Sequence, residues 1–253
     1  MFDVWRIHMF CLLNRRLIQR ISLAASLCVP LLVQAAVSPD RTRIIYDEAA
    51  KSVGVTLNNR SAELPFVVQS WIENESGEKI TSPFMVLPPL QRIEANESSL
   101  LRIVKLPEAE LPKDRESVFY LNVREIPPKS GAVNTIQIAL QSKIKLFYRP
   151  AAVKRERGGD LAEGLQIKLD SAAKKLTIEN PTAFHITVVG LLAGAEKTSM
   201  PIETVMIEPF GSAQFPMSQT GFKELFVSNM NDYGGQADTH FSCSALECKA
   251  AQP

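Results

Sequence analysis

The sequence predicts an all-β protein, and three observations support this class. Apolar and polar residues alternate at period two in many short runs, which is the pattern of strands with one buried face. Beyond the amino-terminal leader, no stretch shows the sustained apolar period of 3.6 residues that an amphipathic helix requires. The 16 prolines fall mostly between these runs, where turns are expected.

An export leader is expected at the amino terminus. Basic residues precede a sixteen-residue apolar run, Ile21–Ala36, which is shorter than the ~20 residues of a bilayer-spanning helix. The run passes through Val33-Gln34-Ala35, whose first and third residues suit the −3 and −1 positions of a cleavage site. We expect cleavage after Ala35, a leader of residues 1–35 and a mature chain that is not embedded in a membrane. The alternative is an uncleaved anchor.

The mature chain is expected to be almost neutral. The leader contains four of the 28 basic residues and one of the 27 acidic residues, which leaves 24 against 26 and a net charge of −2. Whether translation starts at Met1 or Met9 stays open, and the net charge of the mature chain is the same in both cases. No basic tract is interleaved with aromatic residues, so the composition argues against nucleic acid as a partner.

Eleven strands are predicted along the mature chain. Alternation is clearest where the first, third and fifth residues are apolar, as in Val53-Gly-Val55-Thr-Leu57, and the other runs are rich in β-branched and aromatic residues. In chain order the predicted strands are Val53–Leu57, Pro65–Ile72, Leu100–Leu106, Phe119–Val123, Ile136–Leu140, Leu165–Leu169, Lys175–Ile178, Phe184–Leu191, Thr204–Ile207, Phe222–Met230 and Thr239–Cys243.

The number of strands and the chain length suit two domains. An immunoglobulin-like sandwich takes about 100 residues, and the mature chain is roughly twice that length. A charged, glycine-bearing stretch, Lys154–Gly159, lies close to its midpoint. We therefore expect two immunoglobulin-like β-sandwich domains, the first over residues 36–155 and the second over residues 156–253.

The cysteines indicate one disulfide. Cys11 and Cys28 belong to the leader, whereas Cys243 and Cys248 stay in a chain that is sent to an oxidising compartment, where cysteine pairs form disulfides. A metal site is the alternative, but only His240 lies near in the sequence as a further ligand. We expect a Cys243–Cys248 disulfide that fixes the last turn or hairpin, and no metal.

No catalytic constellation is evident in the sequence. The three histidines are His8 in the leader, His185 in an apolar strand and His240 near the cysteines. Neither a G-x-S-x-G nucleophile elbow nor an H-E-x-x-H metal helix occurs. The sequence therefore predicts a protein that is not an enzyme, uses no cofactor and takes no small-molecule substrate.

One predicted strand lies beside an unusual concentration of charge. Ile136, Ile138 and Leu140 form an apolar stripe that leads into a basic segment, Lys143–Arg149. From the residues alone, two interpretations stay open. The strand is either an ordinary part of a sandwich or an edge with which another chain pairs, because unpaired backbone N–H and C=O groups are a template for an added strand.

Several segments resemble one known family, in order and with few gaps, from Ala36 to the second of the two late cysteines. On these segments the chain is identified as a member of the periplasmic pilus (fimbrial) chaperones of the chaperone–usher pathway. The segments are Ala36–Arg43, Trp71–Asn74, Asp114–Pro128, Lys143–Pro150, Glu179–Thr182 and Asn231–Gly235.

The resemblance implies two immunoglobulin-like domains set as an L, with a cleft that binds pilus subunits. These clients are incomplete sandwiches, and the chaperone would fill their hydrophobic groove with a donor strand, Asn134–Leu140, through Ile136, Ile138 and Leu140. It would then deliver each subunit to the outer-membrane usher. The short connection Pro127–Asn134 resembles the short-loop branch of the family, which is associated with rod-like pili. Self-association of the client-free protein stays open.

The resemblance also assigns roles to charged residues. Arg43 and Lys145 match the pair that grips the terminal carboxylate of the subunit, through charge-assisted hydrogen bonds about twice as strong as neutral ones. Lys145 has an odd residue number, whereas the residues of the apolar stripe have even numbers. Lys145 therefore either lies on the opposite face of the strand or is shifted to the same face by a bulge. Glu116, Arg149 and Asp232 match a salt-bridge network between the two domains.

Two other functions compete with this reading. A surface adhesin or structural pilus subunit predicts a single incomplete sandwich with a donor extension at its mature amino terminus, whereas two domains are expected here. A periplasmic carbohydrate-binding or enzymatic module predicts clustered aromatic residues or paired carboxylates. Aromatic residues are only 7% of the sequence, and no such pair is evident.

Overall fold

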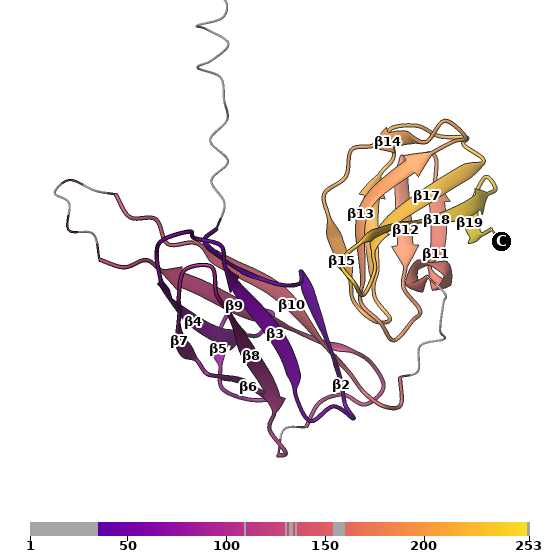
Figure 1. Cartoon of the computed structure of the whole chain (residues 1–253). Coiled ribbons are helices and arrows are strands. Elements are labelled where there is room, and N and C mark those ends of the chain that lie inside the picture. Colours follow the sequence, from indigo (N-terminus) through magenta and orange to yellow (C-terminus); the bar gives the residue numbers. More distant parts are fainter. Residues whose placement is uncertain are drawn as a thin grey trace, which may run out of the picture. The chain divides into compact units, whose positions relative to one another are not determined.

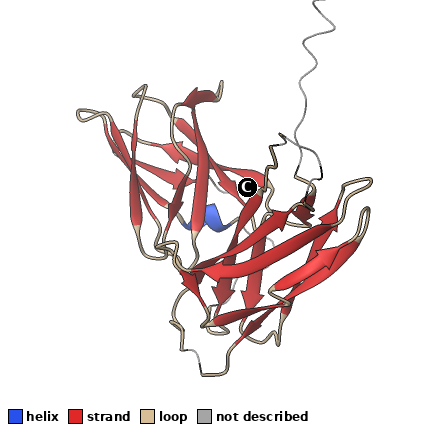
Figure 2. Ribbon diagram, turned by 90° about the vertical axis from the view of Figure 1, so that its left-hand side faces the viewer, coloured by secondary structure: helices blue, strands red, loops and turns tan. Residues whose placement is uncertain are grey.

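The computed structural model describes residues 35–108, 110–129, 131, 134, 136–153 and 160–251. The expected leader therefore lies outside the described residues except for Ala35. Within the described part, regular structure is almost entirely β-strand, and the exception is one short 3₁₀ turn, η1 (Leu161–Gly164), visible in Figure 2. This confirms the expected all-β class. In the same part of the chain, no helix has the length and apolar character that crossing a bilayer requires.

Strands β1 to β10 form two sheets of the first domain (Figure 1). The four-stranded sheet has the order β1-β3-β8-β6 and consists of β1 (Val37–Pro39), β3 (Val53–Asn59), β8 (Ser98–Lys105) and β6 (Phe84–Leu87). The six-stranded sheet has the order β2-β10-β9-β4-β5, with β7 paired to β4, and consists of β2 (Arg43–Asp47), β10 (Gln141–Arg149), β9 (Ser117–Ile126), β4 (Phe66–Glu73), β5 (Lys79–Ile80) and β7 (Leu90–Ile93).

The inner faces of these two sheets share one hydrophobic core. In β4, every second residue from Phe66 to Ile72 is buried, as the period-two pattern predicts. Tyr46 and Phe84 come from different sheets and meet in this core with ring centroids 5.1 Å apart. Each large side chain buried in this way stabilises the domain by about 1.5–3 kcal/mol.

Strands β11 to β19 form one nine-stranded sheet around a separate core. The order is β14-β13-β17-β18-β19-β11-β12-β16, with β15 paired to β13. Leu176, Val227 and Phe241 are completely buried in this second core. The strands are β11 (Gln166–Asp170), β12 (Lys175–Glu179), β13 (Ile186–Ala193), β14 (Thr198–Met200), β15 (Val205–Ile207), β16 (Ser212–Pro216), β17 (Glu224–Met230), β18 (Gln236–Cys243) and β19 (Glu247–Ala250).

Ten of the eleven predicted strands are present, and the strand predicted at Ile136–Leu140 is wrong. Residues 136–140 have no strand assignment, and the strand that follows, β10, runs from Gln141 to Arg149. Only the last residue of the predicted strand takes part in the neighbouring ladder, since the Leu140 carbonyl accepts a hydrogen bond of 3.0 Å from the Glu125 amide.

Two prolines explain why the ladder stops there. β10 pairs with β9 in a register that places Gln141 opposite Arg124. Continued backward, this register sets Ile138 opposite Pro127, and Pro128 comes next. Proline has no N–H to donate, so the antiparallel ladder cannot extend. The apolar alternation at 136–140 is present, but among the described residues no strand pairs with this segment.

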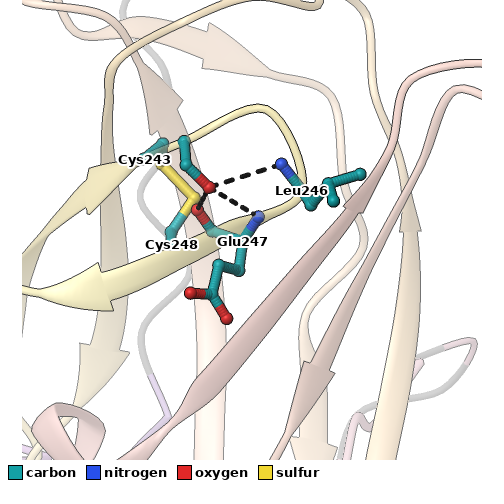
Figure 3. Close-up of a disulfide and its surroundings, with 5 residues drawn as sticks. Cys243, Leu246, Glu247 and Cys248 are labelled. Atoms are coloured by element: carbon teal, nitrogen blue, oxygen red, sulfur yellow. Dashed lines mark hydrogen bonds between the residues drawn. A yellow bond between two sulfur atoms is a disulfide. The ribbon is translucent and has the colours of Figure 1, made fainter.

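The Cys243–Cys248 disulfide is present, with an S–S distance of 2.04 Å, and this confirms the expected pairing. It joins the end of β18 to β19 across a tight turn (Figure 3). Inside the turn, Ser244 Oγ accepts hydrogen bonds from the amides of Leu246 (3.4 Å) and Glu247 (3.2 Å). Both thiols are used in this bond, so the metal alternative is excluded.

Candidate functional site

The candidate site begins with an open strand edge. On one side β10 is paired with β9 along Gln141–Tyr148. On the other side β2 pairs with it in parallel only from Lys145 onward. Among the described residues, the other edge of Gln141–Ile144 therefore has no ladder partner. Such an edge presents free backbone N–H and C=O groups to which another strand can add.

The apolar stripe shares the parity of the core-facing residues of β10 but lies before this strand and outside the core. Ile144 and Tyr148 belong to the core of the first domain, and side chains of equal parity share a strand face. Ile136 and Ile138 have this parity, yet they are 90% and 64% exposed, and Leu140 is half-buried. The two isoleucines thus leave apolar surface that another molecule can cover.

Asn134, the first residue of the expected donor segment, lies in a turn before the stripe. It is exposed and has a φ of 62°. Asparagine is enriched among the residues that adopt this left-handed conformation. Residue 135, which is also part of the expected segment, lies outside the described residues.

Arg43 and Lys145 lie side by side because the parallel pairing of β2 with β10 sets them in register. The ladder with β9 continues past Lys145 without a bulge, so Lys145 lies on the strand face opposite Ile144. This answers the question that its parity left open. Lys145 Nζ donates to Thr187 Oγ1 at 3.3 Å, and Arg43 Nη1 donates to the Met230 carbonyl at 3.1 Å.

Arg43 and Lys145 form no salt bridge with any described residue. The buried Nε of Arg43 also has no hydrogen-bond partner in this part of the chain. Burial lowers the pKa of Lys145, and the charge of Arg43 lowers it further. Burial also lowers the pKa of Arg43, although Asp232 and Glu116 act in the opposite direction. Both cationic forms are therefore disfavoured here, and a bound anion would stabilise them.

The sequence did not reveal the groups that surround the cations. The Phe147 ring lies on the same strand face as Lys145, with its centroid 5.9 Å from Arg43 Cζ and 5.6 Å from the His185 ring. Parity along β10 was the available signal, because residues 145, 147 and 149 share a face. His185 and Thr187 come from β13 and its approach, which nothing in the sequence connects with β10.

Glu116, Arg149 and Asp232 are brought together as a charged network. Arg149 Nη2 is 2.7 Å from Glu116 Oε1, and Arg149 Nη1 is 3.1 Å from Asp232 Oδ2. The second oxygen of Glu116 accepts a 2.9 Å hydrogen bond from the His185 amide. Burial lowers the pKa of Arg149, but the hydrogen bonds and charges of Asp232 and Glu116 outweigh burial and raise it overall.

The open edge and the cation pair adjoin along β10. A strand can add to the unpaired part of β10, and Arg43 and Lys145 can bind an anionic group such as a carboxylate. The arrangement is typical of the class of β-sandwich proteins that bind an extended segment of a partner.

Known proteins share this architecture and sequence. Residues 36–154 match the family described as pili and flagellar-assembly chaperone, PapD N-terminal domain. Residues 160–241 match the family described as pili assembly chaperone PapD, C-terminal domain. The chain belongs to this PapD family of pilus-assembly chaperones.

Individual relatives are similar over most of their length. The chaperone protein PapD of Escherichia coli is 42% identical over 228 residues, 87% of this chain and 93% of PapD. The chaperone protein PmfD of Proteus mirabilis is 41% identical over 223 residues, 86% of this chain and 87% of PmfD. A structure of the Salmonella enterica SafA pilin in complex with the SafB chaperone matches with a TM-score of 0.70 and 27% identity, covering 83% of this chain and 98% of that one.

Proposed function

We propose that this chain is a periplasmic chaperone that stabilises pilus subunits by donating a β-strand and delivers them to an outer-membrane usher. It works without catalysis or a cofactor. The observation that carries this proposal is the exposure of Ile136 and Ile138 beside the open edge of β10. The SafA–SafB complex among the similar structures supports a pilus subunit as the client. The predicted leader and the disulfide support the periplasm.

The positions of the cations imply the direction of the bound strand. A client whose terminal carboxylate meets Arg43 and Lys145 lies along Gln141–Ile144 and extends back beside Ile136–Leu140. It runs parallel to this segment, since its carboxyl end meets the later residues. The anchored end also sets the register, because a slip of one residue would turn every client side chain to the other face.

Strand donation then stabilises the client by burial. The stripe formed by Ile136, Ile138 and Leu140 fills the client's hydrophobic groove, with roughly 25 cal/mol gained for each Å² of apolar surface removed from water. The client's own folding thus supplies the driving force, and no nucleotide is needed.

The charged network is proposed to hold the two domains in a fixed relation. The division into residues 36–155 and 156–253 stays a prediction, supported by the two separate cores and by the two matched family ranges. Arg149 belongs to the first of these ranges and Asp232 to the second. Their ion pair would restrain domain movement, because contacts between domains of one chain are otherwise often mobile.

Substitution of the two cations tests the proposal. R43A and K145A should each fold normally but abolish recovery of the co-expressed pilus subunit encoded beside this protein, because the client's carboxylate loses one of its two partners. The measurement is the amount of subunit that co-purifies from the periplasm, with circular dichroism as the check of folding.

K168A is the matched control. Lys168 is exposed in β11 and pairs with Glu179 at 2.6 Å, so its removal should leave the subunit yield unchanged. Undiminished yield in both R43A and K145A would contradict the anchor.

A further inference from the structure

A buried carboxylate in the first domain has no counter-ion in the described part of the chain. Glu125 is only 4% exposed, and it shares the core-facing parity of Leu121 and Val123 in β9. Charged side chains are rarely this buried unless they are paired, because a carboxylate loses its hydration in the interior. None of the salt bridges formed by the described residues includes Glu125.

The observed partner of this carboxylate points to the missing cation. Glu125 Oε2 accepts a 2.7 Å hydrogen bond from the amide of Val37, the first residue of β1. The preceding residue, Ala36, is held by its own carbonyl, which accepts a 2.7 Å hydrogen bond from the Arg60 amide, and it packs against the core. The carboxylate therefore faces the segment that directly follows the predicted cleavage site.

Covalent geometry limits the distance between Glu125 and the amino group that cleavage would create at Ala36. Three bonds join the nitrogen of Ala36 to that of Val37, so the two nitrogens are at most about 4.3 Å apart. The nitrogen of Ala36 hence lies within about 7 Å of Glu125 Oε2. While the leader is attached this nitrogen is a neutral amide, and after cleavage it is an α-ammonium group.

We propose that Glu125 is the counter-ion of the α-ammonium group that leader removal creates at Ala36, so that processing itself stabilises the first domain. In the precursor the folded domain buries an uncompensated charge. In the mature chain the charge is paired, and β1 is fixed beside Glu125, whose amide also holds Leu140 at the base of the donor segment. The inference rests on cleavage after Ala35 and is independent of any client.

Four proteins in a two-by-two comparison test this pairing. Two begin at Ala36 and two at Ala35, which moves the amino group by one residue, and each start is made with Glu125 and with E125Q. All are released from a fusion by a protease that leaves no residue behind. With Glu125 present, the extra residue should lower the urea midpoint of unfolding, and in the E125Q background it should have no effect.

The reactivity of the amino group provides a second readout. A paired ammonium group loses its proton less often, so the amine of the Ala36 start should be acylated several-fold more slowly with Glu125 than in E125Q, as followed by mass spectrometry. The exposed Glu97 supplies a control, since E97Q should leave this rate unchanged.

Three results would overturn the proposal: equal midpoint changes in both backgrounds, equal acylation rates, or a mature periplasmic protein that starts at a residue other than Ala36. If E125Q does not fold, the wild-type protein with a free or an acetylated Ala36 amine decides the matter. Acetylation should lower its midpoint, and an unchanged midpoint would contradict the pairing. Subunit recovery is not a readout, so the outcome is separate from that of the proposed function.

Discussion

At the scale of single residues, each domain contains a buried asparagine whose side chain donates hydrogen bonds to backbone carbonyls of nearby segments. Asn59 is 2% exposed, and its side-chain amide donates to the carbonyls of Leu64, Ile93 and Glu94 at 2.9–3.1 Å. Asn180, which is 1% exposed, does the same in the second core and donates to the carbonyls of Phe184 (2.7 Å), Ile207 (3.4 Å) and Glu208 (2.9 Å). Each side chain satisfies backbone carbonyls where strand ladders cannot, as buried polar groups require.

Removal of either asparagine should therefore be costly. N59A and N180A should each lower the free energy of unfolding by about 1–3 kcal/mol, because buried carbonyls lose their donor. N58A is the control: Asn58 is only half-buried and bonds the exposed Ser98 hydroxyl, so its change should stay within about 0.5 kcal/mol. Urea unfolding measures all three, and a loss in N59A no larger than in N58A would contradict this role.

At the scale of elements, the two halves of β10 differ in their surroundings: strands flank the second half on both sides, and the first half on one side only among the described residues. Its second half lies between β2 and β9, and its even residues are buried in the core. Before Gln141, the same even parity continues on residues that have lost their ladder because of the prolines after β9. The segment therefore precedes a well-paired strand without belonging to it, and Ile136 and Ile138 remain exposed.

Charge at the stripe should separate binding from stability. I138E should prevent recovery of the co-expressed subunit, because a carboxylate cannot enter an apolar groove unpaired. The free protein should keep its unfolding midpoint within about 0.5 kcal/mol, since Ile138 is 64% exposed. L146E carries the same change at a completely buried position of β10 and should unfold the protein. Collapse of I138E on its own would mean that the residue belongs to the core.

At the scale of the whole molecule, two cores built from separate sets of strands are linked by buried charges. The side chains of Arg149 and Glu116 are 11% and 2% exposed, and that of Asp232 is 16% exposed. Buried networks of this kind add little net stability compared with well-packed apolar residues, but loss of one member leaves the others uncompensated. The network therefore suits a role in holding parts of the molecule in place.

R149A should accordingly destabilise the protein by about 3–5 kcal/mol, because Glu116 and Asp232 would lose the guanidinium group that compensates their charges. R92A is the matched control, since Arg92 forms an exposed pair with Glu94 at 2.8 Å and such pairs contribute about 0–1 kcal/mol. Thermal and urea unfolding of both variants give the comparison. Similar stability of R149A and R92A would show that the network does not matter for folding.

Prediction from sequence was most successful where local chemistry decides the outcome. Alternation identified ten strands because each has one apolar face, and the two late cysteines had no competing partners. It missed short strands such as β1, β5 and β14, because two or three residues are too few to show an alternation of apolar and polar residues. It also extended a strand over Ile136–Leu140, since alternation carries no information about whether a partner strand exists.

The sequence by itself determined the all-β class, the disulfide, the apolar stripe and the family to which the chain belongs, because composition, spacing and order are local properties of the chain. Only the tertiary structure decided that the stripe is exposed, that Lys145 lies beside Arg43 on the opposite strand face, and that Glu125 is buried against the start of β1. These facts depend on ladder register and on contacts between residues far apart in the sequence, such as Lys145 with Thr187. Register follows from which strands meet, and that is settled only when the whole chain has folded.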